Sequence, residues 1–350
     1  MQVEDWLITA IPRHERLSVT VASLLENIIR TNKIEYLNVT SRTKTLDGAI
    51  EKIQRKSYGT PRDQLTDLSG IRVVTYLETH VAQISKLVRE LFQVDEANSL
   101  DRTDQLGEDK LGYRSTHFVC SLGNERGGLP EYAELGDLKF EIQLRTVLQH
   151  AWAELAHDRS FKFGAALPSK IQRKMNLYSG MLELVDAAFD EIAGEIDDYK
   201  HSIEKKTTSQ IFESEIDSIS LSRFVSDLSK QLKIPYQDNT DEKILLELRE
   251  FGLRKIGDIE ALVTAEFREA ISATKERTTS YGLLRDLMMF QDLDRYFGLG
   301  RKFSGIGDST IKFLEVKYPK KKIESWLDKL QIQILGNLAR RRRLLKPVSE

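Results

Sequence analysis

The chain has 350 residues, a length that favours two domains and allows three. Hydrophobic residues make up 40% of it and charged residues 30%, and Cys120 is its one cysteine; this composition excludes a disordered chain, a disulfide scaffold and a cysteine-rich zinc site. Lysine and arginine number 52 against 54 aspartates and glutamates, and the net charge of -2 argues against a histone-like protein without describing local patches.

The sequence carries no signal for a membrane or for export. No apolar run approaches the ~18 residues that a membrane span needs. The first residues, Met1 to Asp5, lack the basic start of a signal peptide. We therefore expect a soluble, cytoplasmic protein that makes no use of a membrane.

The N-terminal half has the pattern of a mixed α/β core. Apolar residues at helical spacing alternate with short runs rich in β-branched residues, which are typical of strands. In chain order we expect helices over 3–30, broken at Pro12, and over 41–56, a strand over 71–77, a helix over 81–92, a loop over 97–111, strands over 113–122 and 138–144, and a helix over 146–157.

The spacing of apolar residues in the C-terminal half predicts helices throughout. A long amphipathic helix is expected around residues 181–192, and the polar, Ser/Thr-rich stretch 201–219 is typical of a linker. Further helices are expected over 221–232, 242–254, 259–274, 283–297 and 323–343. The predicted fold is thus an α/β domain at 1–200, with a mixed sheet flanked by helices, then the linker 201–219 and a mostly α-helical accessory or regulatory domain at 220–350.

Five cations fall on about four turns of the helix expected at 41–56. They are Arg42, Lys44, Lys52, Arg55 and Lys56. A charge run of this kind is most often a solvated helix face. The alternative is a clamp for a triphosphate, because lysine and arginine neutralise and orient polyphosphate oxygens.

Asp67 stands just before the first expected strand, in the segment DLSGIR at 67–72. A carboxylate at the end of a strand can project into a cleft and hold Mg²⁺. Gly70 permits a tight backbone entry there, and Arg72 leads the strand. An Asp-x-x-Gly sequence is more often a simple turn, so this segment alone leaves both interpretations open.

Two further strands place polar side chains on one face each. In GYRSTH at 112–117, alternation puts Tyr113, Ser115 and His117 together, where a ring could stack on a base and an imidazole could donate to a phosphate. A packed strand with a hydrogen-bonded histidine is the simpler alternative. In EIQLRT at 141–146, Glu141, Gln143 and Arg145 share a face; because burying such groups is costly unless they are paired, they indicate a polar cleft.

These four segments, in this order, resemble the synthetase domain of the RelA/SpoT homologue family, which makes the alarmones ppGpp and pppGpp. The matching segments are SRTK at 41–44 with Lys52, Arg55 and Lys56, DLSGIRV at 67–73, GYRSTH at 112–117 and EIQLRT at 141–146, followed by WAELAH at 152–157. The resemblance covers about residues 1–200. It implies transfer of the β,γ-pyrophosphate of ATP to the ribose 3′-OH of GDP or GTP, which leaves AMP.

The resemblance also implies roles for single residues. Those assigned to ATP are Arg42 and Arg72, stacked on the adenine, and Lys44, Lys52, Arg55 and Lys56, at the phosphates. Those assigned to the acceptor nucleotide are Tyr113, stacked on the guanine, Lys110 and His117, at its phosphates, and Gln143 and Arg145, which orient the reacting hydroxyl. Asp67 would bind Mg²⁺. Glu141 would activate the 3′-OH, either as general base or as a second Mg²⁺ ligand.

Long members of this family carry a metal-dependent hydrolase domain ahead of the synthetase. Only about 40 residues precede the first motif here, and they contain no His-Asp pair, so a synthesis-only member is expected. Two alternatives stay open: a toxin-type relative that pyrophosphorylates the 3′ end of tRNA, and a degenerate synthetase that binds nucleotides without catalysis. Homo-oligomers also occur among small members.

The C-terminal half suggests control or targeting, with a partner that the sequence does not identify. Its most basic segment comprises Arg340 to Arg343 together with the nearby Lys346. A solvated helix end is the simplest interpretation. The alternatives are contact with tRNA or ribosomal RNA through phosphates, or a clamp on the synthetase cleft.

Overall fold

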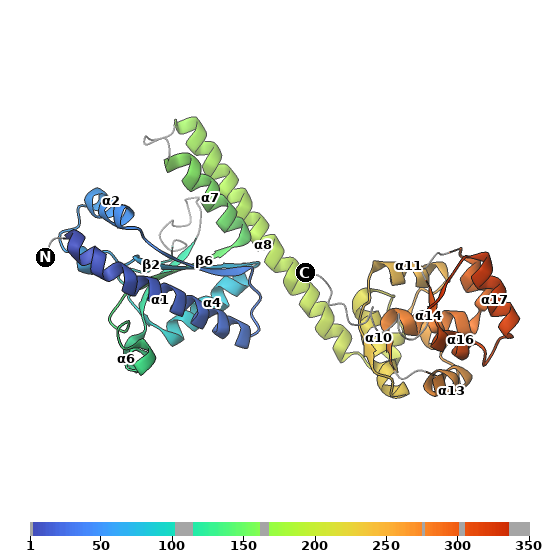
Figure 1. The fold of residues 1–350 in the computed structure, drawn as a ribbon. Helices are drawn as coiled ribbons and strands as arrows, with labels where there is room; N and C mark the ends of the chain where they lie inside the picture. Colours follow the sequence, from blue (N-terminus) through green and yellow to red (C-terminus); the bar gives the residue numbers. More distant parts are fainter. Residues whose placement is uncertain (1–2, 102–114, 162–167, 275–276, 301–304, 336–350) are drawn as a thin grey trace. The chain divides into compact units, whose positions relative to one another are not determined.

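The computed structural model describes residues 3–101, 115–161, 168–274, 277–300 and 305–335, drawn in colour in Figure 1. Lys110 and Tyr113, and the basic segment that begins at Arg340, lie outside these residues. The chain divides into two compact units, Met1–Glu195 and Ile196–Glu350, which are described separately.

The first unit is a mixed α/β domain, as predicted. Its elements are α1 (Val3–Thr31), β1 (Asn38–Thr43), α2 (Leu46–Lys56), α3 (Pro61–Gln64), β2 (Ser69–Thr75), α4 (Glu78–Leu91), β3 (Gln93–Val94), β4 (Leu100–Asp101), β5 (Thr116–Ser121), α6 (Gly123–Gly127), a 3₁₀ turn (Pro130–Tyr132), β6 (Phe140–Thr146), α7 (Val147–Phe161) and most of α8 (Ser169–Lys205).

The sheet has the strand order β1-β2-β6-β5-β3, with β4 paired to β5. Strands β2 and β6 run parallel, while β1 pairs antiparallel with β2 and β5 pairs antiparallel with β6. Helices α1 and α4 lie on one side of the sheet and α7 on the other (Figure 1), where α7 contacts β2 and β6.

The core of this unit lies between the sheet and its two covering helices. Leu17, Val21 and Leu25 of α1 pack with Ile71 of β2 and Ile142 of β6, and all are at most 1% exposed. Alternate residues of the same strands must therefore face the opposite side of the sheet. That second face carries the polar side chains described below.

Two expectations for local structure in this unit are wrong. The first helix is not broken at Pro12 but runs through it, because buried residues on both sides of the proline anchor it: Leu7 packs with Ala49 and Leu68, and Leu17 packs in the core beneath the sheet. Residues 41–43 form the end of β1 and not a helix, because they pair with β2 from Thr43–Ser69 to Ser41–Ile71. Helix α2 starts only after Thr45, whose side chain caps it by accepting from the Gly48 amide.

The second unit is mostly helical, as predicted. Its helices after α8 are α9 (Thr208–Phe212), α10 (Ser218–Leu232), α11 (Glu242–Glu250), α12 (Ile256–Glu260), α13 (Ala265–Thr274), α14 (Ser280–Gln291), α15 (Leu293–Gly298), α16 (Asp308–Leu314) and α17 (Lys320–Lys329). Two-residue strands pair in parallel: β7 (Tyr236–Gln237) with β8 (Thr278–Thr279), and β9 (Ile306–Gly307) with β10 (Ile334–Leu335).

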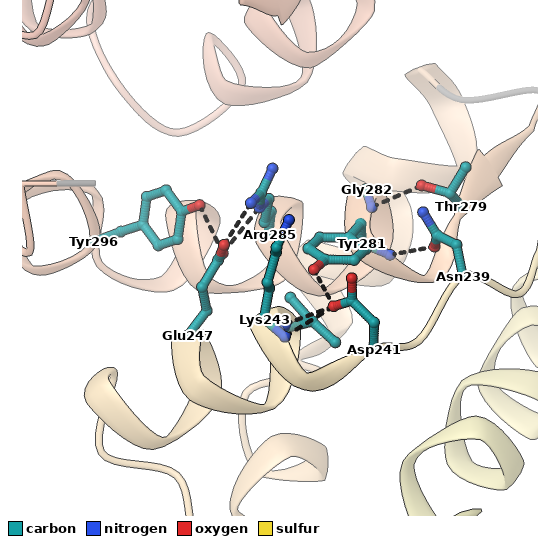
Figure 2. Close-up of polar contacts among 10 residues, drawn as sticks. Asn239, Asp241, Lys243, Glu247, Thr279, Tyr281, Gly282, Arg285 and Tyr296 are labelled. Carbon is teal, nitrogen blue, oxygen red and sulfur yellow. Dashed lines mark hydrogen bonds and ion pairs between the residues drawn. The ribbon is translucent and has the colours of Figure 1, made fainter. Parts of the chain in front are cut away.

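A buried ion pair ties α11 to α14 inside this unit (Figure 2). The Glu247 side chain is 3% exposed and accepts from Arg285 Nε at 2.8 Å. The hydroxyl of Tyr296 donates to the same carboxylate at 3.3 Å. Because the charge is paired and hydrogen-bonded, it can be buried without the penalty of an isolated carboxylate.

The segment 201–219, expected as a linker, is largely structured. Helix α8 continues to Lys205, and α9 begins at a capping box formed by Thr207 and Gln210. Ile203 and Ile211 are buried in the core of the second unit. The segment is polar because it contains exposed helix faces and helix caps. A linker has the same composition, so composition alone predicts a linker here. The helix expected over 323–343 is also shorter, since α17 ends at Lys329.

Among the helices of the described residues, none combines the length and the apolar character needed to cross a membrane.

Candidate nucleotide-binding face of the sheet

One face of the sheet gathers polar side chains from neighbouring strands. The register pairs Arg72 of β2 with Gln143 of β6, and Gln143 in turn with His117 of β5. It also pairs Gly70 with Glu141, two residues earlier on each strand. The predicted alternation of Glu141, Gln143 and Arg145 is therefore confirmed, and the parallel neighbour β2 brings Arg72 alongside them.

Arg42 and Arg72 line one small hollow at the β1 side of this face. Its volume is about 130 Å³, and Gly70 and Gln143 also line it. A Cβ atom added at Gly70 would approach Arg42 Cγ and Nε to 3.4 Å, so the glycine leaves room for the arginine side chain to lie across β2. Two guanidinium planes beside a shared hollow suit the stacking of a flat ring.

Arg72 is held by a residue of α7. Its Nη1 donates to Glu154 Oε1 at 2.9 Å, and His150, one turn earlier, lies 3.7 Å from the same carboxylate. The pKa of His150 is lowered, first by burial and then by the charges of Arg72 and Arg145. The first turns of α7 therefore face a cationic edge of the sheet.

Asp67 lies at the entrance to β2 and pairs with two lysines. Lys52 Nζ, on α2, is 2.6 Å from Asp67 Oδ2, and Lys44 Nζ, just before the helix, is 3.3 Å from the same oxygen. Ala49 orients α2 by packing its buried face toward α1 and Leu68. The structure thus joins two of the five predicted cations to Asp67. Arg55 and Lys56 occupy the exposed last turn of α2.

The second oxygen of Asp67 has a different environment from the first. Within the described residues, Oδ1 is buried and has no hydrogen-bond partner. Buried carboxylate oxygens are normally satisfied, so an orphaned one at the mouth of a polar face fits an Mg²⁺ ligand. The described residues contain no cluster of three or more histidine, cysteine or carboxylate ligands. One or two carboxylates together with substrate phosphates are the usual setting for Mg²⁺ in such sites.

Glu141 sits at the centre of a four-residue hydrogen-bond chain. His117 Nδ1 lies 2.9 Å from Glu141 Oε1, and Gln143 Nε2 donates to Oε2 at 2.7 Å. On the far side of the imidazole, Ser115 Oγ is 2.9 Å from His117 Nε2. Since an ionised carboxylate can only accept, His117 carries a proton on Nδ1 in this arrangement.

These contacts determine the ionisation of Glu141. Burial raises its pKa, but the hydrogen bond and charge of His117, the hydrogen bond from Gln143 and the charge of Lys52 together bring the pKa down to about 2. The carboxylate is consequently charged at neutral pH. Lys52 is also the residue that pairs with Asp67, so one ammonium acts on both carboxylates.

Arg145 is 8% exposed and lies on the same strand face as Glu141 and Gln143. Lys110 and Tyr113, predicted at the acceptor nucleotide, lie outside the described residues. Sequence reasoning gave no role to Glu154 or Ser115. Each stands in a segment of the resemblance, but their contacts with Arg72 and His117 depend on packing between elements.

Comparison with known proteins identifies relatives of the N-terminal half of the chain. Residues 41–166 match the family described as "Region found in RelA / SpoT proteins". The chain is 26% identical to the GTP pyrophosphokinase YjbM of Bacillus subtilis over 172 residues, which cover 48% of this chain and 77% of that protein. It is 24% identical to the GTP pyrophosphokinase YwaC of the same organism, covering 47% of this chain and 77% of the relative.

A solved structure also resembles the chain: the small alarmone synthetase 1 from Bacillus subtilis bound to its product pppGpp. It aligns with a TM-score of 0.45 and 23% identity, over 55% of this chain and 97% of that one. The chain therefore contains a RelA/SpoT region and is distantly homologous to small alarmone synthetases over about half its length.

Proposed function

We propose that the RelA/SpoT region of this chain is a (p)ppGpp synthetase, which transfers pyrophosphate from ATP to the ribose 3′-OH of GDP or GTP. The observation that carries the proposal is the position of Lys52, whose ammonium pairs with Asp67 and acts on Glu141 as well. A lysine paired with a carboxylate whose other oxygen has no hydrogen-bond partner marks the place where negative phosphate charge and a metal can be accommodated together.

ATP would bind at the β1–β2–α2 side of the face. The adenine would stack between Arg42 and Arg72, which share the hollow beside Gly70. Lys44 and Lys52 would leave their ion pairs with Asp67 and turn to the phosphates, with Arg55 and Lys56 supplying further charge. Mg²⁺ would bind Asp67 through the oxygen that has no hydrogen-bond partner and would spread the phosphate charge.

The acceptor nucleotide would bind at the β5–β6 side. His117 and Lys110 would contact its phosphates, Tyr113 would stack on its guanine, and Gln143 and Arg145 would orient its ribose. The ionised Glu141 would accept a hydrogen bond from the 3′-OH and direct the oxygen at the β-phosphorus. Holding both nucleotides in this geometry supplies most of the rate, because phosphoryl-type transfer asks little covalent chemistry of the protein.

In the transfer itself, a bond forms between the ribose 3′ oxygen and the β-phosphorus of ATP. The bond from the β-phosphorus to the oxygen bridging it to the α-phosphate breaks, and AMP leaves with that oxygen. The hydroxyl proton passes to solvent. A carboxylate with a pKa of about 2 is a weak base, so Glu141 suits a role as hydrogen-bond acceptor or second metal ligand better than one as general base.

The product profile tests this proposal. The full chain is incubated with Mg²⁺ and γ-labelled ATP, and GDP, GTP and bulk tRNA are offered in turn. Label in a guanosine nucleotide that carries a 3′-pyrophosphate is the expected result. Label in tRNA alone would favour the toxin-type activity, and ATP binding without any labelled product would favour a nucleotide sensor.

A further inference from the structure

The second unit contains a hollow of about 770 Å³ between the end of α8, the helix α10 and the loop that joins β7 to α11. Every residue that lines it belongs to this unit, and none takes part in the site proposed above. A volume of that size lies within the range of sites that bind small molecules. The lining side chains therefore indicate what kind of molecule fits.

The loop after β7 brings a fixed carboxylate to this hollow. Asp238 Oδ1 accepts from Ser280 Oγ at 2.9 Å and from the Thr240 amide at 3.0 Å. The hydroxyl of Ser222, on α10, donates to Oδ2. Burial raises the pKa of Asp238, but these hydrogen bonds outweigh it and bring the pKa below its usual value. A carboxylate can accept about four hydrogen bonds, so this one can take a further donor from a ligand.

Asn239 adds a donor beside that acceptor. Its Oδ1 accepts from the backbone amide of Tyr281 at 3.1 Å (Figure 2). Because that bond assigns the oxygen, the Nδ2 group at the other end of the side chain is a donor. It makes no hydrogen bond to another described residue. An acceptor and a donor at consecutive positions suit hydroxyl groups, which both donate and accept.

Helix α10 adds hydroxyl groups along the hollow. Ser218, Ser222 and Ser226 follow one another at four-residue intervals, so they lie on one face of the helix, and all three line the hollow. The hydroxyls of Ser218 and Ser226 make no hydrogen bond to another described residue. They are therefore available to a ligand as donors or as acceptors.

An apolar surface lies among these polar groups. Tyr236 of β7 and Ile219 of α10 are partly buried, because they pack against the core of the second unit, and both also line the hollow. A tyrosine ring combines a broad apolar body with a polar hydroxyl at its tip. A ligand that fits this lining has an apolar face as well as hydroxyl groups.

The charges around the hollow balance one another. Asp227 lies 3.5 Å from both Arg223 and Lys230. Lys200 lies 3.0 Å from Asp197. The lining as a whole has three cations, Lys200, Arg223 and Lys230, and three carboxylates, Glu204, Asp227 and Asp238. Since each cation already has a carboxylate, the hollow lacks the excess positive charge that favours a phosphate group.

We propose that this hollow binds an uncharged ring compound with neighbouring hydroxyl groups, as found in a sugar and in the ribose of a nucleoside. One hydroxyl would donate to Asp238, and its neighbour would accept from Asn239 Nδ2. The serine hydroxyls of α10 would bind the remaining polar groups, and the apolar face of the ring would lie against Tyr236. The proposal does not depend on the proposed catalytic function.

Calorimetric titration of the full chain with ribose, glucose and adenosine, in separate experiments, tests the proposal. At least one of these probes should bind with a dissociation constant of about 1 mM or tighter. Binding of ribose or glucose identifies a free sugar as the ligand class, and binding of adenosine alone identifies a nucleoside.

Substitutions locate the bound probe. Ser226→Leu should weaken its binding about tenfold or more, because the larger side chain occupies the hollow. Ser272→Leu is the matched control, since Ser272 is exposed on α13 and does not line the hollow; it should leave binding unchanged. Asn239→Asp keeps an oxygen for the Tyr281 amide but removes the donor, so it should weaken binding several-fold. Circular dichroism establishes that each variant is folded.

The proposal is overturned if none of the three probes binds at concentrations up to about 10 mM. Binding that is as tight in Ser226→Leu as in Ser272→Leu would place the probe outside the hollow and would overturn it as well. AMP serves as a charged probe. If AMP binds more tightly than adenosine and Ser226→Leu abolishes that binding, the hollow is a phosphate site and the uncharged ligand class is wrong.

Discussion

Lys52 Nζ, on α2, lies 2.6 Å from Asp67 Oδ2 at the entrance to β2. The charge of the same ammonium lowers the pKa of Glu141 on the neighbouring strand β6. Without nucleotide, the cation neutralises a carboxylate that the proposed reaction needs for Mg²⁺. When ATP binds with its metal, Lys52 would exchange Asp67 for a phosphate group, and Asp67 would exchange the lysine for Mg²⁺. The ion pair that joins Lys52 to Asp67 in the site without nucleotide is therefore one that substrate binding would break.

Replacing Lys52 with alanine should remove this shared charge. We expect kcat/KM for pyrophosphate transfer to fall about 10²- to 10³-fold, since one cation aimed at developing phosphate charge is worth that much in comparable sites. Steady-state assays with ATP and GDP measure the loss. Lys86→Ala, on the exposed surface of α4, is the control and should retain full activity. A Lys52 variant as active as that control would contradict the assignment.

Glu141→Gln keeps the size of the side chain and removes its charge. Synthesis should fall about 10²- to 10⁴-fold while ATP still binds, because the residue is proposed to act on the acceptor hydroxyl and not on the donor. Activity and calorimetric titration with a non-hydrolysable ATP analogue separate the two effects. Retained synthesis would refute the role, and loss of ATP binding would move Glu141 to the donor site.

Glu154→Gln should release Arg72 from α7. The pair is partly exposed, with the glutamate side chain 58% exposed, so its removal costs little stability. A freed Arg72 should bind the adenine more readily and lower KM for ATP by up to about fivefold at unchanged kcat. Glu134→Gln, which loses a similar exposed pair with Arg16, is the control. An increase in KM would mean that Glu154 positions Arg72 and does not compete for it.

His14 should make the first unit sensitive to mild acid. Its ring contacts Ser69 Oγ at 2.8 Å beneath the sheet, and burial, aided by the charge of Arg13, lowers its pKa to about 4. Unfolded chains protonate this histidine below about pH 6.5 and the folded chain does not, so stability falls by about 1.4 kcal/mol per pH unit between 6.5 and 4.

Hydrogen exchange of the β2 amides at pH 6.5, 5.5 and 4.5 measures that slope. The side chain of the His14→Gln variant takes up no proton. The dependence of its opening free energy on pH should therefore be smaller by about 1.4 kcal/mol per pH unit over this range. An equal slope in both proteins would show that other groups control the acid response.

Much of the candidate site could be predicted from local sequence, because strand alternation is a local rule. The side chains of Glu141, Gln143 and Arg145 share a face in β6 for that reason. The error at Ser41 to Thr43 shows the limit: their neighbours suggested a helix, but pairing with β2 made them a strand. Long-range hydrogen bonds decided a segment whose local pattern was ambiguous.

Contacts between elements that are distant in sequence could not be predicted from local sequence patterns. Arg72 and Glu154 are 82 residues apart in sequence, and nothing in either segment specifies the other. In the same way, Ile203 and Ile211 stand in a polar stretch, and only the packing of the second unit makes them part of its core. Composition describes the exposed surface of such helices better than the few apolar residues that anchor them.

The stoichiometry of the leaving group shows whether the two terminal phosphoryl groups of ATP move together. With β- and γ-labelled ATP and unlabelled GDP or GTP, we expect one AMP for every guanosine nucleotide modified, and both labels together on its 3′ position. Release of ADP, or a product that carries only the γ label, would mean transfer of a single phosphoryl group and would contradict that expectation.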